Sequence, residues 1–274
     1  MADAPAVRAA LVGATGRTGR AIAALAASGG EIEIVSAVAS PGSEHRGRDL
    51  GELIAQQRTG IVIGDDLDAA LDAAQVVLDF SHPVRTESLV RACRAARRPL
   101  LIGTTGLPAS LYAALASASR DIALLVAPNT SIGVTVLLEL VRQAAHALPG
   151  EFDVEIGEAH HRYKRDAPSG TALAFGDAVA RARGGTLQGQ RAPPRDGARE
   201  RQAGEIGFAV VRGGDIVGEH DVRFIGTGEE VSLAHRATDR AIFARGAIRA
   251  AIWLAGQPPG RYQMGDVLGF AKLS

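Results

Sequence analysis

Residues 7–19 read VRAALVGATGRTG and decide the first part of the fold. The apolar run Val7–Val12 has the length of a buried strand, and a helical pattern, Arg17–Ala27, follows it directly. Glycines at this junction permit a tight turn and let the backbone approach a pyrophosphate, which the free N–H groups of the helix start attract. We therefore predict a dinucleotide-binding turn formed by Gly13, Ala14, Thr15, Gly16, Arg17 and Thr18.

The spacing G-x-x-G-x-x-G is a variant of the usual dinucleotide fingerprint and is weak evidence when taken alone. Its position after a strand and before a helix strengthens the prediction. A glycine turn without a ligand is the alternative.

The rest of the first half alternates short apolar runs with helical patterns. Short buried strands separated by helices indicate a parallel, doubly wound sheet. The predicted strands are Ile32–Val38, Val76–Phe80, Pro99–Ile102 and Ile122–Val126, and the predicted helices between them are Val84–Ala96 and Pro108–Ser119.

A different pattern follows a long predicted helix, Gly133–Ala147. Apolar and polar residues alternate from Phe152 to Ile156, which is typical of a strand with one exposed face. Further expected elements are the strands Ile206–Arg212, Glu219–Ile225 and Glu230–Arg236, the helix Ala172–Arg183, a mobile loop Gly184–Glu205, and a helix Ala241–Leu254 that leads back to the first domain.

We therefore predict an α/β fold with two domains. Residues 1–130 and 240–274 form a Rossmann-like domain that binds the dinucleotide. Residues 131–239 form a smaller α+β domain with a mostly antiparallel sheet.

Composition excludes several classes of function. The 274 residues carry 30 basic and 30 acidic side chains, so nothing attracts nucleic acid by net charge, and aromatic residues make up only 4%. No apolar run reaches the roughly 20 residues of a membrane span, and residues 1–7 lack a secretion signal. The single cysteine, Cys93, cannot form an internal disulfide, which favours a reducing compartment, the cytoplasm.

Two further strand ends carry small polar residues suited to a cofactor. Ligands bind at the carboxyl ends of strands in open parallel sheets. The residues expected to line the cofactor there are Gly103, Thr104, Thr105, Ala127, Pro128, Asn129 and Thr130. For Thr104 and Asn129 taken singly, turn or capping roles are as good an explanation.

The residues after the second strand bear on the choice of cofactor. No acid occurs from Val38 until Glu44, whereas Arg17, Arg46 and Arg48 lie nearby in sequence. Such a site repels a 2′-phosphate less than an acidic one. This favours NADPH, with NADH as the other nicotinamide cofactor.

The densest concentration of reactive side chains is residues 158–171, EAHHRYKRDAPSGT. A strand ends at His160 and His161, and a helix starts at Pro168. Free N–H groups at that start, together with the hydroxyls of Ser169 and Thr171, predict an anion site that would hold a carboxylate.

Lys164 adds a full charge to this site, and it is one of only two lysines in the chain. A plain surface loop is the alternative for the whole segment. A metal site is disfavoured because adjacent strand histidines point to opposite faces and no cysteine or closely spaced carboxylate completes a ligand set.

These motifs together resemble the dihydrodipicolinate reductase family. The resemblance rests on Gly13–Arg20, Asp79–Ser81, Gly103–Gly106, the His160–Thr171 run, Ile206–Phe208 and Gly213–His220, and so spans nearly the whole chain. The His160–Thr171 run is the most specific of them.

The resemblance implies NAD(P)H-dependent reduction of 4-hydroxy-tetrahydrodipicolinate, a cyclic dicarboxylate, in diaminopimelate and lysine biosynthesis. It implies that His160 is the general acid/base and Lys164 a second proton donor, and that His161, Gly170 and Thr171 bind substrate. It also implies a homotetramer assembled through the sheet of the second domain. One departure is Ala39, because members that use NADH well often have an acid there.

Two other functions fit parts of the sequence. The Gly13–Gly16 turn also resembles redox-sensing proteins that bind NADP without turnover, although these need no His160–Thr171 run. Another two-domain amino-acid or semialdehyde dehydrogenase is the second alternative. An acyl-enzyme mechanism would require a cysteine nucleophile, and Cys93 lies outside every motif.

Overall fold

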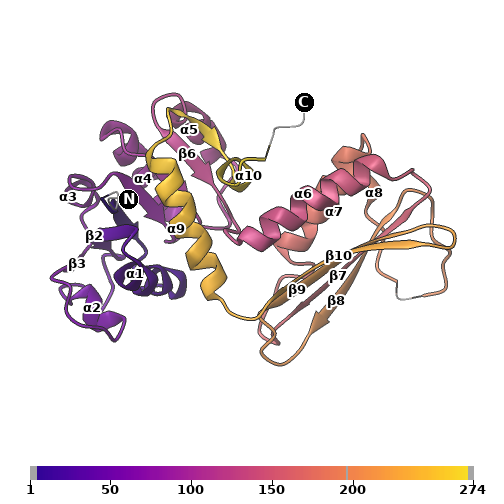
Figure 1. The fold of residues 1–274 in the computed structure, drawn as a ribbon, viewed down its shortest axis with the longest axis horizontal. Helices are drawn as coiled ribbons and strands as arrows, with labels where there is room; N and C mark the ends of the chain where they lie inside the picture. Colours follow the sequence, from indigo (N-terminus) through magenta and orange to yellow (C-terminus); the bar gives the residue numbers. More distant parts are fainter. Residues whose placement is uncertain (1–4, 196, 271–274) are drawn as a thin grey trace. The chain divides into compact units, whose positions relative to one another are not determined.

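The computed structural model describes residues 5–195 and 197–270, which form two compact units (Figure 1). Unit 1 extends to Ile132 and resumes at Ala241, while unit 2 is the continuous segment Gly133–Arg240.

Unit 1 is built on a seven-stranded sheet in the order β11-β6-β5-β4-β1-β2-β3. All neighbouring strands in it are parallel. The strands are β1 (Val7–Val12), β2 (Ile32–Val38), β3 (Ile63–Gly64), β4 (Val76–Asp79), β5 (Leu100–Ile102), β6 (Ala123–Val126) and β11 (Gly260–Tyr262). The predicted parallel sheet is thus confirmed.

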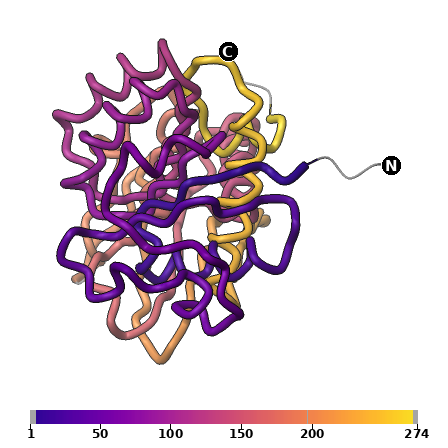
Figure 2. Tube along the Cα trace, turned by 90° about the vertical axis from the view of Figure 1, so that its left-hand side faces the viewer, coloured from indigo at the N-terminus to yellow at the C-terminus, as the bar shows by residue number. Residues whose placement is uncertain are grey.

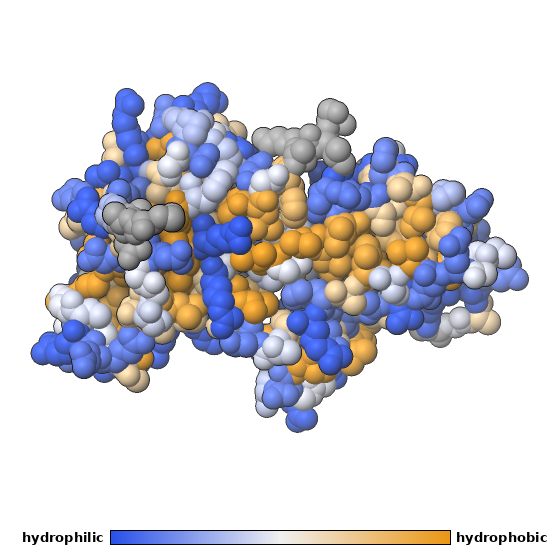
Figure 3. Space-filling model, in the orientation of Figure 1, coloured by the Kyte–Doolittle hydropathy of each residue, from blue (hydrophilic) through white to orange (hydrophobic). Residues whose placement is uncertain are grey.

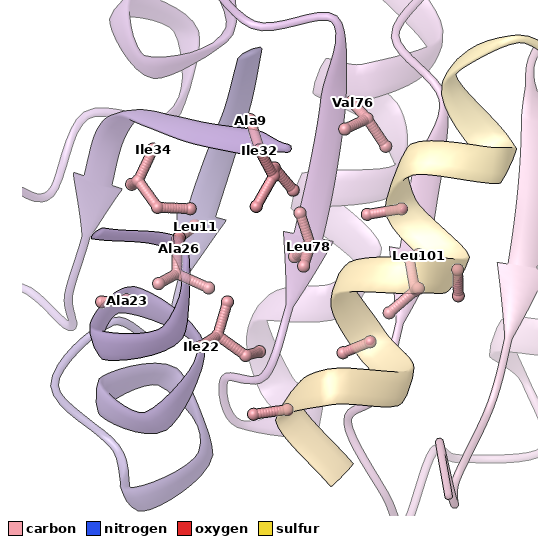
Figure 4. Packing of buried hydrophobic residues seen from close by; sticks show 14 of the residues in the cluster. Ala9, Leu11, Ile22, Ala23, Ala26, Ile32, Ile34, Val76, Leu78 and Leu101 are labelled. Atoms are coloured by element: carbon pink, nitrogen blue, oxygen red, sulfur yellow. The ribbon is translucent and has the colours of Figure 1, made fainter. Parts of the chain in front are cut away.

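Helices cover both faces of this sheet, which explains why its central strands are mostly apolar. The helices are α1 (Arg17–Gly29), α2 (Leu50–Leu53), α3 (Leu67–Leu71), α4 (Pro83–Ala95), α5 (Leu111–Ala118), α9 (Ala241–Ala255) and α10 (Met264–Val267). Alternate residues of β1 enter different cores: Leu11 packs with α1 and α9, and Val12 packs with α4 and α5. Figure 4 shows the first of these cores, where Ile22 of α1 meets Leu11 and Leu78.

The C-terminal segment completes unit 1. Strand β11 pairs with β6 at one edge of the sheet, and α9 packs beside α1 (Figures 1 and 2). Gly246 lets α9 pack closely against the main chain at Thr130, because a Cβ at this position would collide with the Thr130 carbonyl. The hydroxyl of Thr130 also donates to the Phe243 carbonyl at 2.7 Å.

Unit 2 contains a four-stranded sheet in the order β10-β9-β7-β8. Its strands are β7 (Asp153–His160), β8 (Ile206–Arg212), β9 (Gly218–Ile225) and β10 (Glu230–Ala237). Only the pair β7–β8 is parallel, so the sheet is mostly antiparallel, as predicted.

One face of the unit 2 sheet is covered by α6 (Ile132–Ala147) and α7 (Gly170–Ala182), with Phe175 and Phe224 fully buried in the shared core. The outer side of α6 keeps apolar side chains at the surface. Val136 is 38% exposed and Leu140 45%, and this apolar strip is visible in Figure 3. No helix in the described part of the chain has the length and apolar character needed to cross a membrane.

The predicted loop Gly184–Glu205 has more structure than expected. It contains a short helix, α8 (Leu187–Gln190), and an isolated bridge joins Arg191 to Ile206. Arg195 lies 3.0 Å from the Glu155 carboxylate of β7. Ion pairs therefore tie part of this connector to the sheet.

Candidate active site

The glycine turn after β1 forms a bare cradle at the start of α1. Gly13 has φ +84°, a conformation that favours glycine, and a Cβ there would collide with the Phe80 carbonyl. Gly16 is the N-cap of α1 and offers no side chain to cap the first turn. The free N–H groups of that turn can therefore receive a phosphate, and the cradle fits a dinucleotide.

Phe80 and Asp79 support this cradle from the end of β4. The Phe80 ring fills the space that a Cβ on Gly103 would need, so strands β1, β4 and β5 converge closely here. The Asp79 carboxylate is fully buried and accepts bonds from the Ser81 hydroxyl at 2.5 Å and the Thr86 hydroxyl at 3.2 Å. Burial raises the pKa of Asp79, although these bonds oppose the rise.

The predicted cofactor residues after β5 and β6 divide into two groups. Thr104 and Thr130 are buried, and their hydroxyls donate to main-chain carbonyls. Thr105 and Pro128 are exposed, and the Asn129 side chain accepts from the Ser131 N–H at 2.9 Å in a local turn. The structure thus leaves Thr105 accessible and uses Thr104 and Thr130 to hold the two loops.

Arginines gather beside the end of β2. Arg20 Nη2 lies 3.0 Å from His45 Nε2, and Arg48 Nη1 lies 3.4 Å from His45 Nδ1. Arg17 is exposed on the first turn of α1, whereas Arg46 is paired with Asp65 at 2.9 Å. Of the three arginines expected to favour a 2′-phosphate, Arg46 is therefore already neutralised.

In unit 2, the reactive side chains lie at the end of β7. Glu158 and His160 are two residues apart, so both side chains project from the same face of the strand. His160 Nδ1 lies 2.6 Å from Glu158 Oε2, and Arg212 of β8 binds the two oxygens of Glu158 at 2.7 Å each. The Glu158 side chain has no exposed surface, and that of His160 is 12% exposed.

Glu158, His160 and Arg212 shift one another's pKa values. Burial would raise the pKa of Glu158, but bonds from Arg212, His160 and the Ser169 N–H outweigh it and hold the pKa below its ordinary value. Burial lowers the pKa of His160, and the Glu158 carboxylate partly offsets this. Glu158 is therefore ionised at neutral pH.

The His220 ring lies next to the His160 ring, with centroids 5.1 Å apart in an edge-to-face arrangement. Its Nε2 lies 3.1 Å from the Ser169 hydroxyl, which also accepts from the Ala172 N–H and so caps α7. Burial, followed by the proximity of His160, lowers the pKa of His220 to about 4. His220 is thus a neutral core histidine.

Ser169 was predicted to help bind an anion, but its polar groups are already bonded. Its N–H donates to Glu158, its hydroxyl bonds to Ala172 and His220, and its carbonyl accepts from the Leu173 N–H. Since Ser169 is also 2% exposed, its role in this structure is to hold the start of α7 in place.

Lys164 lies on the loop between β7 and α7. Its Nζ is 2.9 Å from Asp166 Oδ2, and its side chain is 21% exposed. The hydrogen bond from Lys164 lowers the pKa of Asp166. Gly170 starts α7 with open space around its Cα, so the first turn of the helix is accessible at this position.

Glu158 and Arg212 have no functional role in the prediction from the sequence. Glu158 could have been found, because the period of a strand places it on the same face as His160. Arg212 is 54 residues away and is brought close only by the parallel pairing of β7 with β8. Within the described residues, no group of three or more His, Cys, Asp or Glu is placed to hold a metal ion.

Two family models match almost the whole chain. Residues 7–130 match the model described as "Dihydrodipicolinate reductase, N-terminus", and residues 133–268 match "Dihydrodipicolinate reductase, C-terminus".

Relatives of similar length agree with these models. The 4-hydroxy-tetrahydrodipicolinate reductase of Alkalilimnicola ehrlichii is 49% identical over 96% of this chain and 98% of its own. The protein of the same name from Nitrosospira multiformis is 48% identical over the same shares.

Solved structures reproduce the two-unit architecture. A dipicolinate-bound dihydrodipicolinate reductase from Paenisporosarcina sp. TG-14 superposes with a TM-score of 0.75 at 24% identity, covering 94% of this chain and 97% of its own. An amine dehydrogenase from Mycobacterium smegmatis gives 0.60 at 13% identity, covering 94% and 95%. At these identities the likeness extends to the fold alone.

Proposed function

The chain belongs to the dihydrodipicolinate reductase family, and we infer from this membership that it catalyses the reduction for which its relatives are named. It is an oxidoreductase that uses a nicotinamide cofactor and converts 4-hydroxy-tetrahydrodipicolinate to tetrahydrodipicolinate in diaminopimelate and lysine biosynthesis. The substrate first loses its hydroxyl, together with a hydrogen from an adjacent carbon, as water. One carbon of the resulting unsaturated ring then gains a hydride, and a neighbouring atom gains a proton.

Unit 1 binds the cofactor in this proposal. The Gly13–Thr18 turn receives the pyrophosphate at the start of α1, and Gly103–Thr105 and Ala127–Thr130 line the nicotinamide end. When bound, NADPH or NADH supplies the hydride, and the protein contributes binding and orientation. The exposed Arg17 and Arg48, with no acid at Ala39, favour NADPH.

Unit 2 binds the substrate and transfers the proton. His161, Gly170 and Thr171 hold the substrate, whose carboxylate is attracted to the N-terminus of α7 and to the charge of Lys164. His160 is the general acid/base, and Lys164 is a second proton donor. Ser169 acts indirectly, by holding the start of α7.

The contact between His160 and Glu158 is the main support for His160 as the general acid/base. Its Nδ1 faces an ionised, fully buried carboxylate at 2.6 Å, which leaves Nε2 as the nitrogen for proton exchange. This environment suits a general acid/base better than that of His220, whose protonation is suppressed by burial.

A direct assay tests the proposal. The purified protein, freshly made substrate and NADPH should show loss of cofactor absorbance, and His160→Gln should lower kcat by about 10²–10⁴-fold with little change in cofactor affinity. His146→Gln, on the exposed last turn of α6, is the control. Cofactor binding without turnover in the wild type would favour the redox sensor. Turnover only with other amino-acid substrates would favour a different dehydrogenase.

We also propose a cytoplasmic homotetramer that assembles through the open face of the unit 2 sheet. That face carries ion pairs such as Arg223–Asp221 and Arg236–Glu219, and on strand β8 Val211 is 56% exposed. Partly apolar surface of this kind on a regular sheet suits association with identical copies.

A further inference from the structure

We propose that Glu158, clamped by Arg212, is a positioning residue that fixes which nitrogen of His160 carries the proton and supports the protonated ring. The proposal rests on the proposed role of His160 as the acid/base. It adds to the reaction two residues that do not themselves contact the reacting atoms.

The hydrogen bonds that Glu158 accepts determine which nitrogen of His160 carries the proton. Oε1 accepts from the Ser169 N–H at 2.9 Å and from Arg212 Nη2 at 2.7 Å, and Oε2 accepts from Arg212 Nη1 at 2.7 Å. An ionised carboxylate accepts bonds and donates none. At the 2.6 Å contact His160 Nδ1 must therefore be the donor, so the neutral ring carries its proton on Nδ1 and leaves Nε2 free to exchange one.

Arg212 makes this carboxylate rigid. Its guanidinium spans both oxygens of Glu158 in the two-bond geometry that fixes a carboxylate most firmly. It also donates to the Asp166 carbonyl at 2.6 Å, within the loop that carries Lys164. A simple structural ion pair would need neither the histidine nor this loop. The Glu158–Arg212 pair thus fixes the position of the His160 ring relative to the loop that carries Lys164.

Glu158 also affects the pKa of His160. The groups near the ring are Glu158 on β7, Arg212 on β8, His220 on β9 and Lys164 on the following loop. Burial, Lys164 and Arg212 lower the pKa of His160, and Glu158 alone among the named causes raises it. Removing the charge of Glu158 leaves only the lowering effects, so less His160 is protonated and available to donate at neutral pH.

The test uses Glu158→Gln, which keeps the side-chain size and removes the charge. Glu139→Gln is the matched control, because Glu139 is also paired with an arginine in unit 2, at 2.5 Å from Arg142. Histidines are labelled with ¹⁵N, and the His160 signals are identified as those missing from His160→Gln. The tautomer and the titration midpoint of His160 are then read by NMR in each protein.

We expect the Nδ1–H tautomer in the wild type and in Glu139→Gln. In Glu158→Gln that tautomer should be lost or mixed, and the midpoint should fall. In the same variant kcat should fall by about 10–100-fold at neutral pH, by analogy with the carboxylate partners of metal-bound histidines, while KM changes little. The limb of the kcat profile that falls with rising pH should move to lower pH.

The outcomes separate the two proposals. An Nε2–H tautomer in the wild type would overturn the positioning role without any variant, even if Glu158→Gln does not fold. So would an unchanged tautomer and pH profile in a folded Glu158→Gln protein, since a merely structural role lowers Tm alone. Near-normal kcat in His160→Gln would instead refute the proposed acid/base role, while the tautomer could still be measured.

Discussion

Buried neutral His220 should make unit 2 less stable in acid. Protonation would add a charge and a second N–H donor, and Nδ1 has no hydrogen-bond partner among the described residues. The folded pKa of His220, about 4, lies below the ordinary 6.5. Because the unfolded chain binds this proton more readily, the stabilisation is complete above pH 6.5 and is lost as the pH falls towards 4.

The size of this effect follows from the two pKa values. Between pH 8 and pH 5 the single site should cost about 2 kcal/mol of unfolding free energy, from a folded pKa of about 4 and an unfolded pKa of 6.5. His220→Gln removes the titration, so this variant should lose about 2 kcal/mol less than the wild type over the same interval. Its stability at pH 8 alone is not the quantity of interest.

Urea unfolding followed by circular dichroism at pH 8 and pH 5 measures this difference. Tryptophan fluorescence is unsuitable, because the single tryptophan, Trp253, lies in unit 1. His146→Gln, an exposed histidine of unit 2, should behave like the wild type. Equal losses of unfolding free energy between pH 8 and pH 5 in the wild type and His220→Gln would show that burial does not hold His220 neutral.

Three other predictions concern catalysis and assembly. Lys164→Ala and Lys164→Arg should both have low kcat, because arginine cannot release a proton, and the alanine variant should also have a raised KM; wild-type kcat in Lys164→Arg would leave Lys164 as an anchor only. NADPH should give a kcat/KM at least equal to that of NADH, since no acid lies between the end of β2 and Glu44, and a tenfold advantage for NADH would contradict this. Light scattering should give a mass near four chains, and a clean monomer at micromolar concentration would argue against the tetramer.

The long elements were predictable because their patterns are strong. Strand β1 has the predicted bounds, and α1 and α9 differ from the prediction only near their ends. The missed elements are short: helices α2, α8 and α10 span four residues each, α3 spans five, and β3 has two. Segments of this length show no periodicity. Strand β11 has three residues, follows two prolines and pairs with β6.

Parts of the candidate site could be proposed from the sequence where the side chains are neighbours along the chain. His160 and Lys164 lie within one motif, whereas the Glu158–Arg212 clamp depends on strand register. Ser169 is a residue for which the local sequence suggested a role that its contacts in the fold do not support. Its hydroxyl suggested an anion site, but the approach of His220, 51 residues away, uses that oxygen within the core.

The interrupted layout of unit 1 affects how the chain is made. A ribosome releases chain from the N-terminus, and domains generally fold as units. Unit 2 is complete once Arg240 has emerged, whereas the sheet of unit 1 then still lacks β11 and α9. The apolar face that includes Leu11 and Leu78 stays uncovered by α9 while all of unit 2 is synthesised. Apolar surface left exposed in this way makes a partly folded chain prone to aggregate, and here the exposure lasts until α9 has been synthesised.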